Sequence, residues 1–340
     1  MLFDSNVIKP SASAPRWQDV IKKYQTPETW RGIWQISNTI TPYIVLWYLM
    51  YLSLSYSYFL TLLLALPAAG LVMRTFIIQH DCGHGSFFKS QKANDLVGTF
   101  CGFLTMVPYY QWRHEHAIHH ATSGDLDRRG VGDVSTLTVK EYLAMSKWKR
   151  FQYRFYRNMA VMLVIGPIWT FVVSHRFVRK NSGRREARNV YLTDLALLAI
   201  WSSLCLTIGV KGFLMIWIPV TMFSGVMGIW LFYVQHQYEN SYWRRKEEWD
   251  YVTSAVMGSS YFKLPRALQW FSGNIGFHHI HHLSPKIPNY KLEQCHNETP
   301  MFQEAVVLDL RSSLKSGSLK LWDEEQRKMV GFKHLKSSNS

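Results

Sequence analysis

Four apolar stretches dominate the middle of the chain, and they come in two pairs. The stretches cover residues 36–54, 56–78, 190–208 and 213–234. Each is almost free of charge and has about the 20 residues that a helix needs to cross a bilayer. Short turns at residues 53–57 and 209–212 separate the members of each pair. The pattern predicts two membrane-spanning helical hairpins.

Two further apolar segments, residues 96–110 and 159–173, are shorter and interrupted by glycine and proline. At about 15 residues they are too short and too broken to span a bilayer. We expect the first to be re-entrant or interfacial. We expect the second to lie along the membrane face, together with the basic residues 147–158 and 176–188 on either side of it. If the two hairpins make the only crossings, all the long polar segments lie on one side of the membrane.

The distribution of Lys and Arg indicates on which side of the membrane the polar segments lie. Of 38 Lys and Arg residues, only Lys211 lies in a loop on the far side, so the positive-inside rule predicts a cytosolic polar face and cytosolic termini. The formal net charge of +15 is suited to an anionic lipid surface or an acidic protein partner. No nucleic-acid-binding motif accompanies the charge, so we expect no nucleic-acid partner.

The predicted fold is therefore an all-α membrane protein. It has four transmembrane helices in two hairpins, re-entrant or interfacial helices, and a cytosolic helical cap. We divide the chain into three parts: an N-terminal cytosolic arm, a membrane domain with its cap, and a cytosolic tail, at residues 1–35, 36–295 and 296–340.

Three histidine clusters stand in the polar segments: HDCGH at 80–84, HEHAIHH at 114–120 and HHIHH at 278–282. Eight of the 14 histidines follow the pattern HxxxH, HxxHH, HxxHH: His80, His84, His116, His119, His120, His278, His281 and His282. Gaps of three or four residues place such side chains on one face of a helix. The spacing leaves out His114 and His279, which we treat either as residues that support the ligands or as spare donors.

Eight imidazoles exceed the ~4 to 6 ligands of one ion, so the count predicts a di-metal site in the cap. The pattern has no thiolate ligands, which disfavours an iron–sulfur cluster. A zinc hydrolase would ordinarily use bridging carboxylates, but the spacing alone leaves iron, copper and zinc open. Candidates to orient the ligands by accepting their N–H groups are Asp81, Glu115, Asp125 and Asp127, and Asn274 is a candidate to hold a water near the metals.

These motifs resemble the integral-membrane fatty acid desaturases, over residues of about 35 to 295. HDCGHGSFF, WRHEHAIHH and GFHHIHHLSPKIPNY are most similar to the acyl-lipid delta-12 (omega-6) branch of bacteria and photosynthetic membranes. The resemblance implies a non-haem centre of two iron ions that uses O2 to introduce a cis double bond into the acyl chain of a membrane lipid. It also implies a ninth ligand at the end of the second hairpin, which is His236, and a place in the bacterial inner membrane.

The electrons must come from another protein, because the sequence has no haem-binding domain, CxxC pattern or nucleotide-binding glycine fingerprint. We expect an external carrier of the ferredoxin or cytochrome type. Two other functions stay open: a related di-iron hydroxylase or ketolase of alkanes, sterols or carotenoids, and a non-catalytic metal carrier or sensor. A carrier would distribute ionisable residues along its spans, and here the spans almost lack them.

Overall fold

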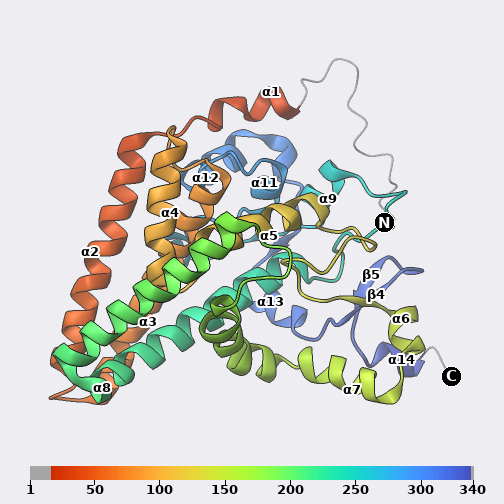
Figure 1. Ribbon diagram of the computed structural model, residues 1–340. Coiled ribbons are helices and arrows are strands. Elements are labelled where there is room, and N and C mark those ends of the chain that lie inside the picture. The colour runs from red at the N-terminus through yellow and green to blue at the C-terminus, as the bar shows by residue number, and fades with distance from the viewer. Residues whose placement is uncertain (1–16, 338–340) are drawn as a thin grey trace.

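The computed structural model describes residues 17–337, and the fold is predominantly helical (Figure 1). Part of the expected N-terminal arm, residues 1–16, and the last three residues, 338–340, lie outside the described residues. The predicted cytosolic location of the two termini therefore concerns residues outside the described part of the chain.

The first predicted hairpin consists of α2 (Thr29–Ser53) and α3 (Tyr58–His84). The turn between them is closed by a hydrogen bond between the hydroxyls of Ser53 and Thr61, 2.7 Å apart. Helix α3 continues beyond the predicted end at residue 78. It stops at Gly85, whose φ of 67° is the left-handed conformation that glycine supplies at helix ends. The extension carries the HDCGH motif, with His80 and His84, on the last turns of α3.

The second predicted hairpin is the long element α8 (Arg184–His236), which is broken at Gly209. This residue has φ 75° and ψ 152°, a combination that is open to glycine and strained for other residues. The halves on either side turn back on each other, since the rings of Trp201 and Trp217 lie 5.2 Å apart (Figure 1). The predicted four-residue turn is thus a break at a single glycine.

Two helices, α3 and α8, are long and apolar enough to cross a bilayer. A third span results if α7 (Lys147–Tyr156) and residues 161–176, which meet at a bend of 59°, are counted as one. Helix α2 has 25 residues, a sufficient length, but its tryptophan, tyrosine and polar residues make it less apolar. Helix α3 packs against α2, α4 and α8.

Shorter helices surround this bundle. They are α1 (Trp17–Ile21), α4 (Gln91–Thr105), α5 (Tyr109–Thr122), α6 (Val139–Ala144), α9 (Tyr251–Met257), α10 (Arg266–Phe271), α11 (His278–Leu283), α12 (Asn289–Glu298), α13 (Leu310–Ser316) and α14 (His334–Ser337). The expected re-entrant segment 96–110 forms most of α4 and the start of α5, and a left-handed residue, Met106, separates these helices. Residues 161–173 form two π-helical turns, Val161–Ile165 and Ile168–Val173.

Two small parallel strand pairings, absent from the all-α expectation, tie distant segments together. Strand β1 (Leu137–Thr138) pairs with β4 (Leu321–Asp323), which also pairs antiparallel with β5 (Lys328–Val330). Strand β2 (Tyr261–Phe262) pairs with β3 (Val307–Leu308). Residues of the expected C-terminal tail are therefore built into the cap, and Trp322 of β4 is buried.

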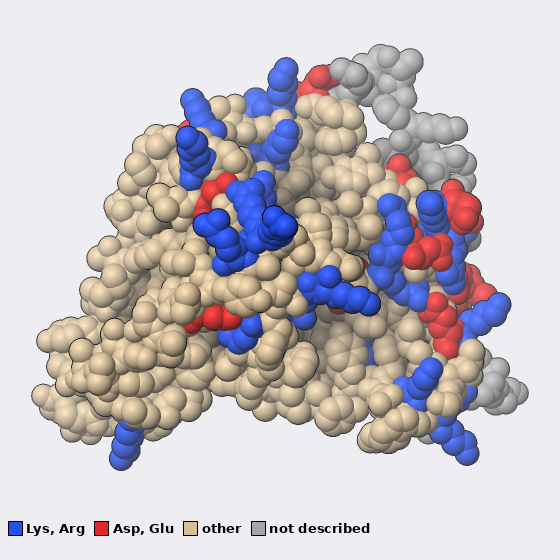
Figure 2. Space-filling view, viewed as in Figure 1, with Lys and Arg blue, Asp and Glu red and all other residues tan. Residues whose placement is uncertain are grey.

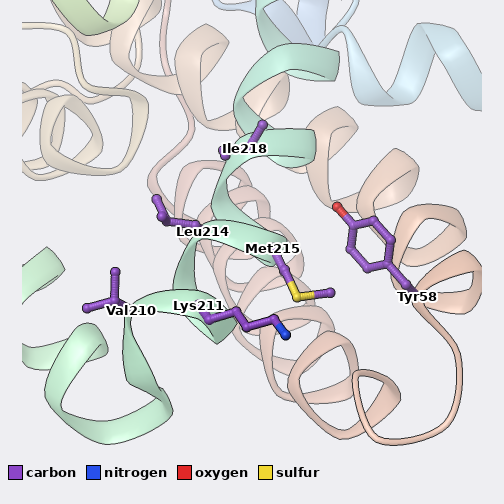
Figure 3. A pocket seen from close by; sticks show the side chains of 6 residues that line it. All are labelled: Tyr58, Val210, Lys211, Leu214, Met215 and Ile218. Atoms are coloured by element: carbon purple, nitrogen blue, oxygen red, sulfur yellow. The ribbon is translucent and has the colours of Figure 1, made fainter.

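Charge is distributed unevenly over the surface. In Figure 2, acidic and basic side chains gather on the cap, while the end of the bundle that carries the α8 turn is almost entirely uncharged. A shallow groove of about 510 Å³ lies at that end (Figure 3), lined by Tyr58, Val210, Lys211, Leu214, Met215 and Ile218. The charge asymmetry expected from the sequence is therefore present in the fold.

Candidate metal centre

Four helices bring nine histidines together at the cap end of the bundle. Helix α3 contributes its last turns, α8 its final residue, α5 three side chains and α11 three more. In the short helix α11, the i, i+3 and i+4 positions point to one side, as the spacing predicts. The structure thus brings together the eight histidines of the HxxxH and HxxHH patterns and His236, which the resemblance adds.

The first cluster contains five histidines from three helices: His80, His84, His116, His120 and His281. One nitrogen of each lies within 4.8 Å of the others. The Nε2 atom of His120 lies 3.1 Å from that of His116 and 3.0 Å from that of His281. The indole of Trp112 stacks on His116 with ring centroids 4.4 Å apart and fixes the orientation of this imidazole.

The second cluster contains His119, His236 and His282, again with one nitrogen of each within 4.8 Å of the others. His278 adjoins it, because its Nε2 atom lies 3.0 Å from that of His236. A polar cavity of about 10 Å³, room for about one water molecule, borders His236. The nine side chains therefore form two adjacent groups.

The donors are arranged as a metal requires. Burial lowers the pKa of His116, His120, His278, His281 and His282 well below its usual value, so these imidazoles are neutral, the form that binds metals. The Nε2 atoms of His84, His119 and His282 are buried without a hydrogen-bond partner among the described residues. Buried unpaired nitrogens are costly, and convergent cations would pair them. Each group could therefore hold a metal ion such as iron, copper or zinc.

One carboxylate proposed from the sequence contacts a cluster histidine. Asp81 Oδ1 lies 3.1 Å from His80 Nδ1, which leaves Nε2 of this ring to face the first cluster. The other oxygen, Oδ2, accepts hydrogen bonds from the backbone N–H and side-chain amide of Asn289, at 2.6 and 2.8 Å. Asn289 is in turn held by Gln35 of α2. The sequence pattern does not indicate a role for either Asn289 or Gln35.

The second cluster is oriented by two hydrogen-bond acceptors that the sequence pattern does not indicate. Asp133 Oδ1 lies 2.5 Å from His119 Nδ1, and the carbonyl of Gly258 lies 3.1 Å from His236 Nδ1. Asp133 stands in a loop 14 residues after His119, where no periodic pattern links the two. Its place in an otherwise polar, glycine-rich segment is the only signal that the sequence offers.

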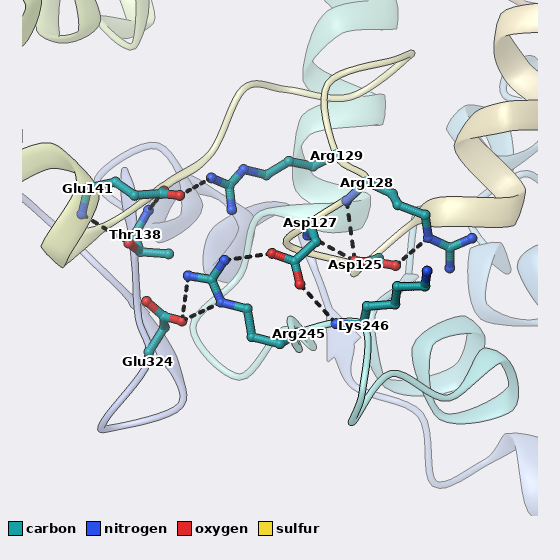
Figure 4. Close-up of polar contacts among 9 residues, drawn as sticks. All are labelled: Asp125, Asp127, Arg128, Arg129, Thr138, Glu141, Arg245, Lys246 and Glu324. Atoms are coloured by element: carbon teal, nitrogen blue, oxygen red, sulfur yellow. Dashed lines mark hydrogen bonds and ion pairs between the residues drawn. The ribbon is translucent and has the colours of Figure 1, made fainter.

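The remaining carboxylate candidates have other partners, and Figure 4 shows those of Asp125 and Asp127. Glu115 pairs with Arg179, and Asp125 accepts from Arg128. Asp127 binds Arg245, which also binds Glu324 between β4 and β5. The contacts of Asp125 and Asp127 hold the loop after α5 against its neighbours, and none of these contacts orients a cluster histidine.

Asn274 and the two spare histidines lie outside the clusters. The Asn274 amide donates to the carbonyl of Asn289, so it supports Asp81 only indirectly. His279 is fully buried beside His296 and Phe302, and burial lowers its pKa to about 3. His114 is exposed on α5.

Comparisons with known proteins bear on the chemistry of this centre. The fatty acid desaturase family model matches residues 53–308. A fatty acid desaturase of Bacillus subtilis (strain 168) is 48% identical over 316 residues, which cover 93% of this chain and 90% of the relative. An sn-1 oleoyl-lipid 12-desaturase of Synechocystis is 28% identical over 232 residues, 65% of this chain and 63% of the relative. An sn-1 acyl-lipid omega-3 desaturase (ferredoxin) of Synechocystis is 29% identical over 238 residues, 64% of this chain and 61% of the relative.

Proposed function

The chain belongs to the fatty acid desaturase family of oxidoreductases, and we propose that it introduces a cis double bond into acyl chains of membrane lipids. The proposed cofactor is a pair of iron ions, the co-substrate is O2, and the proposed position is delta-12 (omega-6). The observation that carries the proposal is the convergence of nine histidines on two adjacent groups.

The division of labour follows from the substrate. An unactivated methylene has neither an acidic proton nor a leaving group, so side chains acting as bases or nucleophiles cannot attack it. Bound iron would supply the oxidising chemistry. The proposed ligands are His80, His84, His116, His120 and His281 for one ion and His119, His236, His278 and His282 for the other.

Other residues of the chain orient the proposed ligands and shield them from water. Asp81 and Asp133 accept the Nδ1–H groups of His80 and His119 and so keep Nε2 free for metal. The carbonyl of Gly258 does the same for His236. Burial excludes water, which protects an oxidising centre from side reactions.

We propose four membrane crossings: α2, α3 and the two halves of α8. Residues 147–188 then lie along the cytosolic face of a bacterial inner membrane, and residues 1–35 and 296–340 are also cytosolic. Parity supports this topology, because one additional crossing between the three histidine motifs of the sequence would place them on opposite sides of the membrane. Electrons would reach the basic cap from an acidic ferredoxin or cytochrome, and the name of one Synechocystis relative includes ferredoxin.

The test is lipid analysis of a host that contains both saturated and monounsaturated acyl chains and a reduced carrier. We expect dienoic chains that depend on expression, with the new bond located by mass spectrometry of disulfide adducts. The His281→Ala chain, expressed at the same level, is the control. A new bond elsewhere would overturn only the delta-12 assignment, whereas hydroxylated or ketonic products would overturn desaturation.

A further inference from the structure

Helix α7 exposes an aromatic stripe that nothing within residues 17–337 covers. Trp148, Phe151 and Phe155 are 65%, 57% and 53% exposed. Spacings of three and four residues place the rings on one face, and those of Trp148 and Phe151 stack with centroids 5.4 Å apart. A contiguous exposed apolar patch of this kind marks a contact surface.

The opposite side of α7 is fixed to the cap, which sets the direction of the stripe. The Tyr153 hydroxyl donates to the carbonyl of Lys320 at 2.6 Å. Arg157, directly after the helix, donates to the carbonyl of Ser135 at 2.7 Å and to Gln237 at 2.8 Å. Tyr153 and Arg157 are buried. Because they are about half a helical turn from the aromatic residues, the stripe points away from the protein.

The charges beside the stripe are uniformly positive. Lys147, Lys149, Arg150 and Arg154 belong to the same helix. Arg150 and Arg154 donate to neutral partners, the carbonyl of Met145 and the hydroxyl of Tyr142. The 44 residues from 142 to 185 contain ten Lys and Arg and no Asp or Glu. The cations of α7 thus have no acidic residue in their own segment to neutralise them.

The stripe continues into apolar surface. Beyond the 59° bend the chain runs through residues 161–176, which together with α7 have the composition of a membrane span. Val164, Ile168 and Trp169 of this segment are exposed as well. Figure 1 places α7 at the outer edge of the cap, away from α5 and α11, which carry six of the nine histidines. A cationic helix with an aromatic face, joined to an exposed apolar segment, has the properties of a helix that lies in a membrane interface.

We propose that α7 lies in the membrane interface and binds the anionic headgroups of phospholipids. Trp148, Phe151 and Phe155 enter the upper acyl region, and Lys147 and Lys149 contact lipid phosphates. This activity is separate from desaturation. An acidic protein would match the charges, but the continuity with the apolar segment favours a bilayer.

The test measures hydrogen exchange of the α7 amides in the full chain, reconstituted in nanodiscs of phosphatidylcholine alone or mixed with phosphatidylglycerol. Anionic lipid should slow exchange of residues 147–156 by about fivefold or more, because each Lys near an anionic surface contributes ~1 kcal/mol. High salt should remove most of the difference. The double variant Lys147→Gln with Lys149→Gln should lose it, while the control Lys246→Gln with Lys333→Gln, exposed lysines elsewhere, should keep it.

Equal exchange in the two kinds of disc would overturn the proposal. Slowing by added ferredoxin but not by anionic lipid would also overturn it and would identify a protein partner. The readout does not depend on activity or metal content, so a failure here is distinguishable from a failure of the proposed desaturation.

Discussion

The two histidine clusters are held in different ways. The first has five imidazoles from α3, α5 and α11, with Asp81 adjacent in sequence to the histidine it orients. The second has three, with His278 beside them, and depends on Asp133 in a loop and on the carbonyl of Gly258. The first cluster is rich in donors and locally supported, while the second has fewer donors and long-range supports. We therefore expect the second to lose its metal more readily.

The largest effect on metal content should follow from His236→Ala. This change leaves the second cluster with too few donors, so the purified chain should lose about one iron per molecule and all desaturase activity. Metal analysis by mass spectrometry checks the loss. Full iron content in this variant would remove His236 from the ligand set.

His281→Ala should also abolish activity, but it should remove less iron, because four imidazoles of the first cluster remain. His279→Gln is the matched control on the same helix. It should keep both iron and turnover, since the His279 ring lies against His296 and Phe302. Loss of iron in the control with full iron in His281→Ala would contradict the argument from helical spacing.

The same contrast explains what the sequence could predict. The grouping of His278, His281 and His282 follows from helical periodicity, and the break at Gly209 follows from a glycine-containing turn between apolar stretches. The family resemblance is confirmed by the family match. Asp133 reaches His119 from a loop, and Asn289 reaches Asp81 through long-range packing; neither contact follows a period that the sequence could reveal. The pairing of β1 with β4 joins residues far apart in the chain and was missed for the same reason.

Removing a carboxylate that orients a histidine should lower the affinity for iron by an intermediate amount. Asp133→Asn should weaken iron binding by roughly 10- to 100-fold, and Asp81→Asn by less within that range, because the first cluster has more donors. Glu115→Gln is the control, since Glu115 pairs with Arg179. Titration with an iron chelator measures the affinities. A larger loss in the control than in Asp133→Asn would exclude the proposed role of Asp133.

The smallest effect on either cluster should come from the far end of the bundle. Gly209→Ala has room for the methyl group, but its φ of 75° is strained for alanine. The change should lower the free energy of unfolding by roughly 1–3 kcal/mol and leave the iron content unchanged. Thermal unfolding in detergent, followed by metal analysis of the folded chain, tests this separation. Iron loss without a change in unfolding temperature would show that the turn is coupled to the clusters.

The metal-to-protein ratio of the purified, active wild-type chain tests the central claim most directly. Two adjacent histidine groups predict two iron ions per chain, and activity that rises with iron content until both are bound. Full activity with a single ion per chain, or with zinc in place of iron, would contradict the two-iron centre.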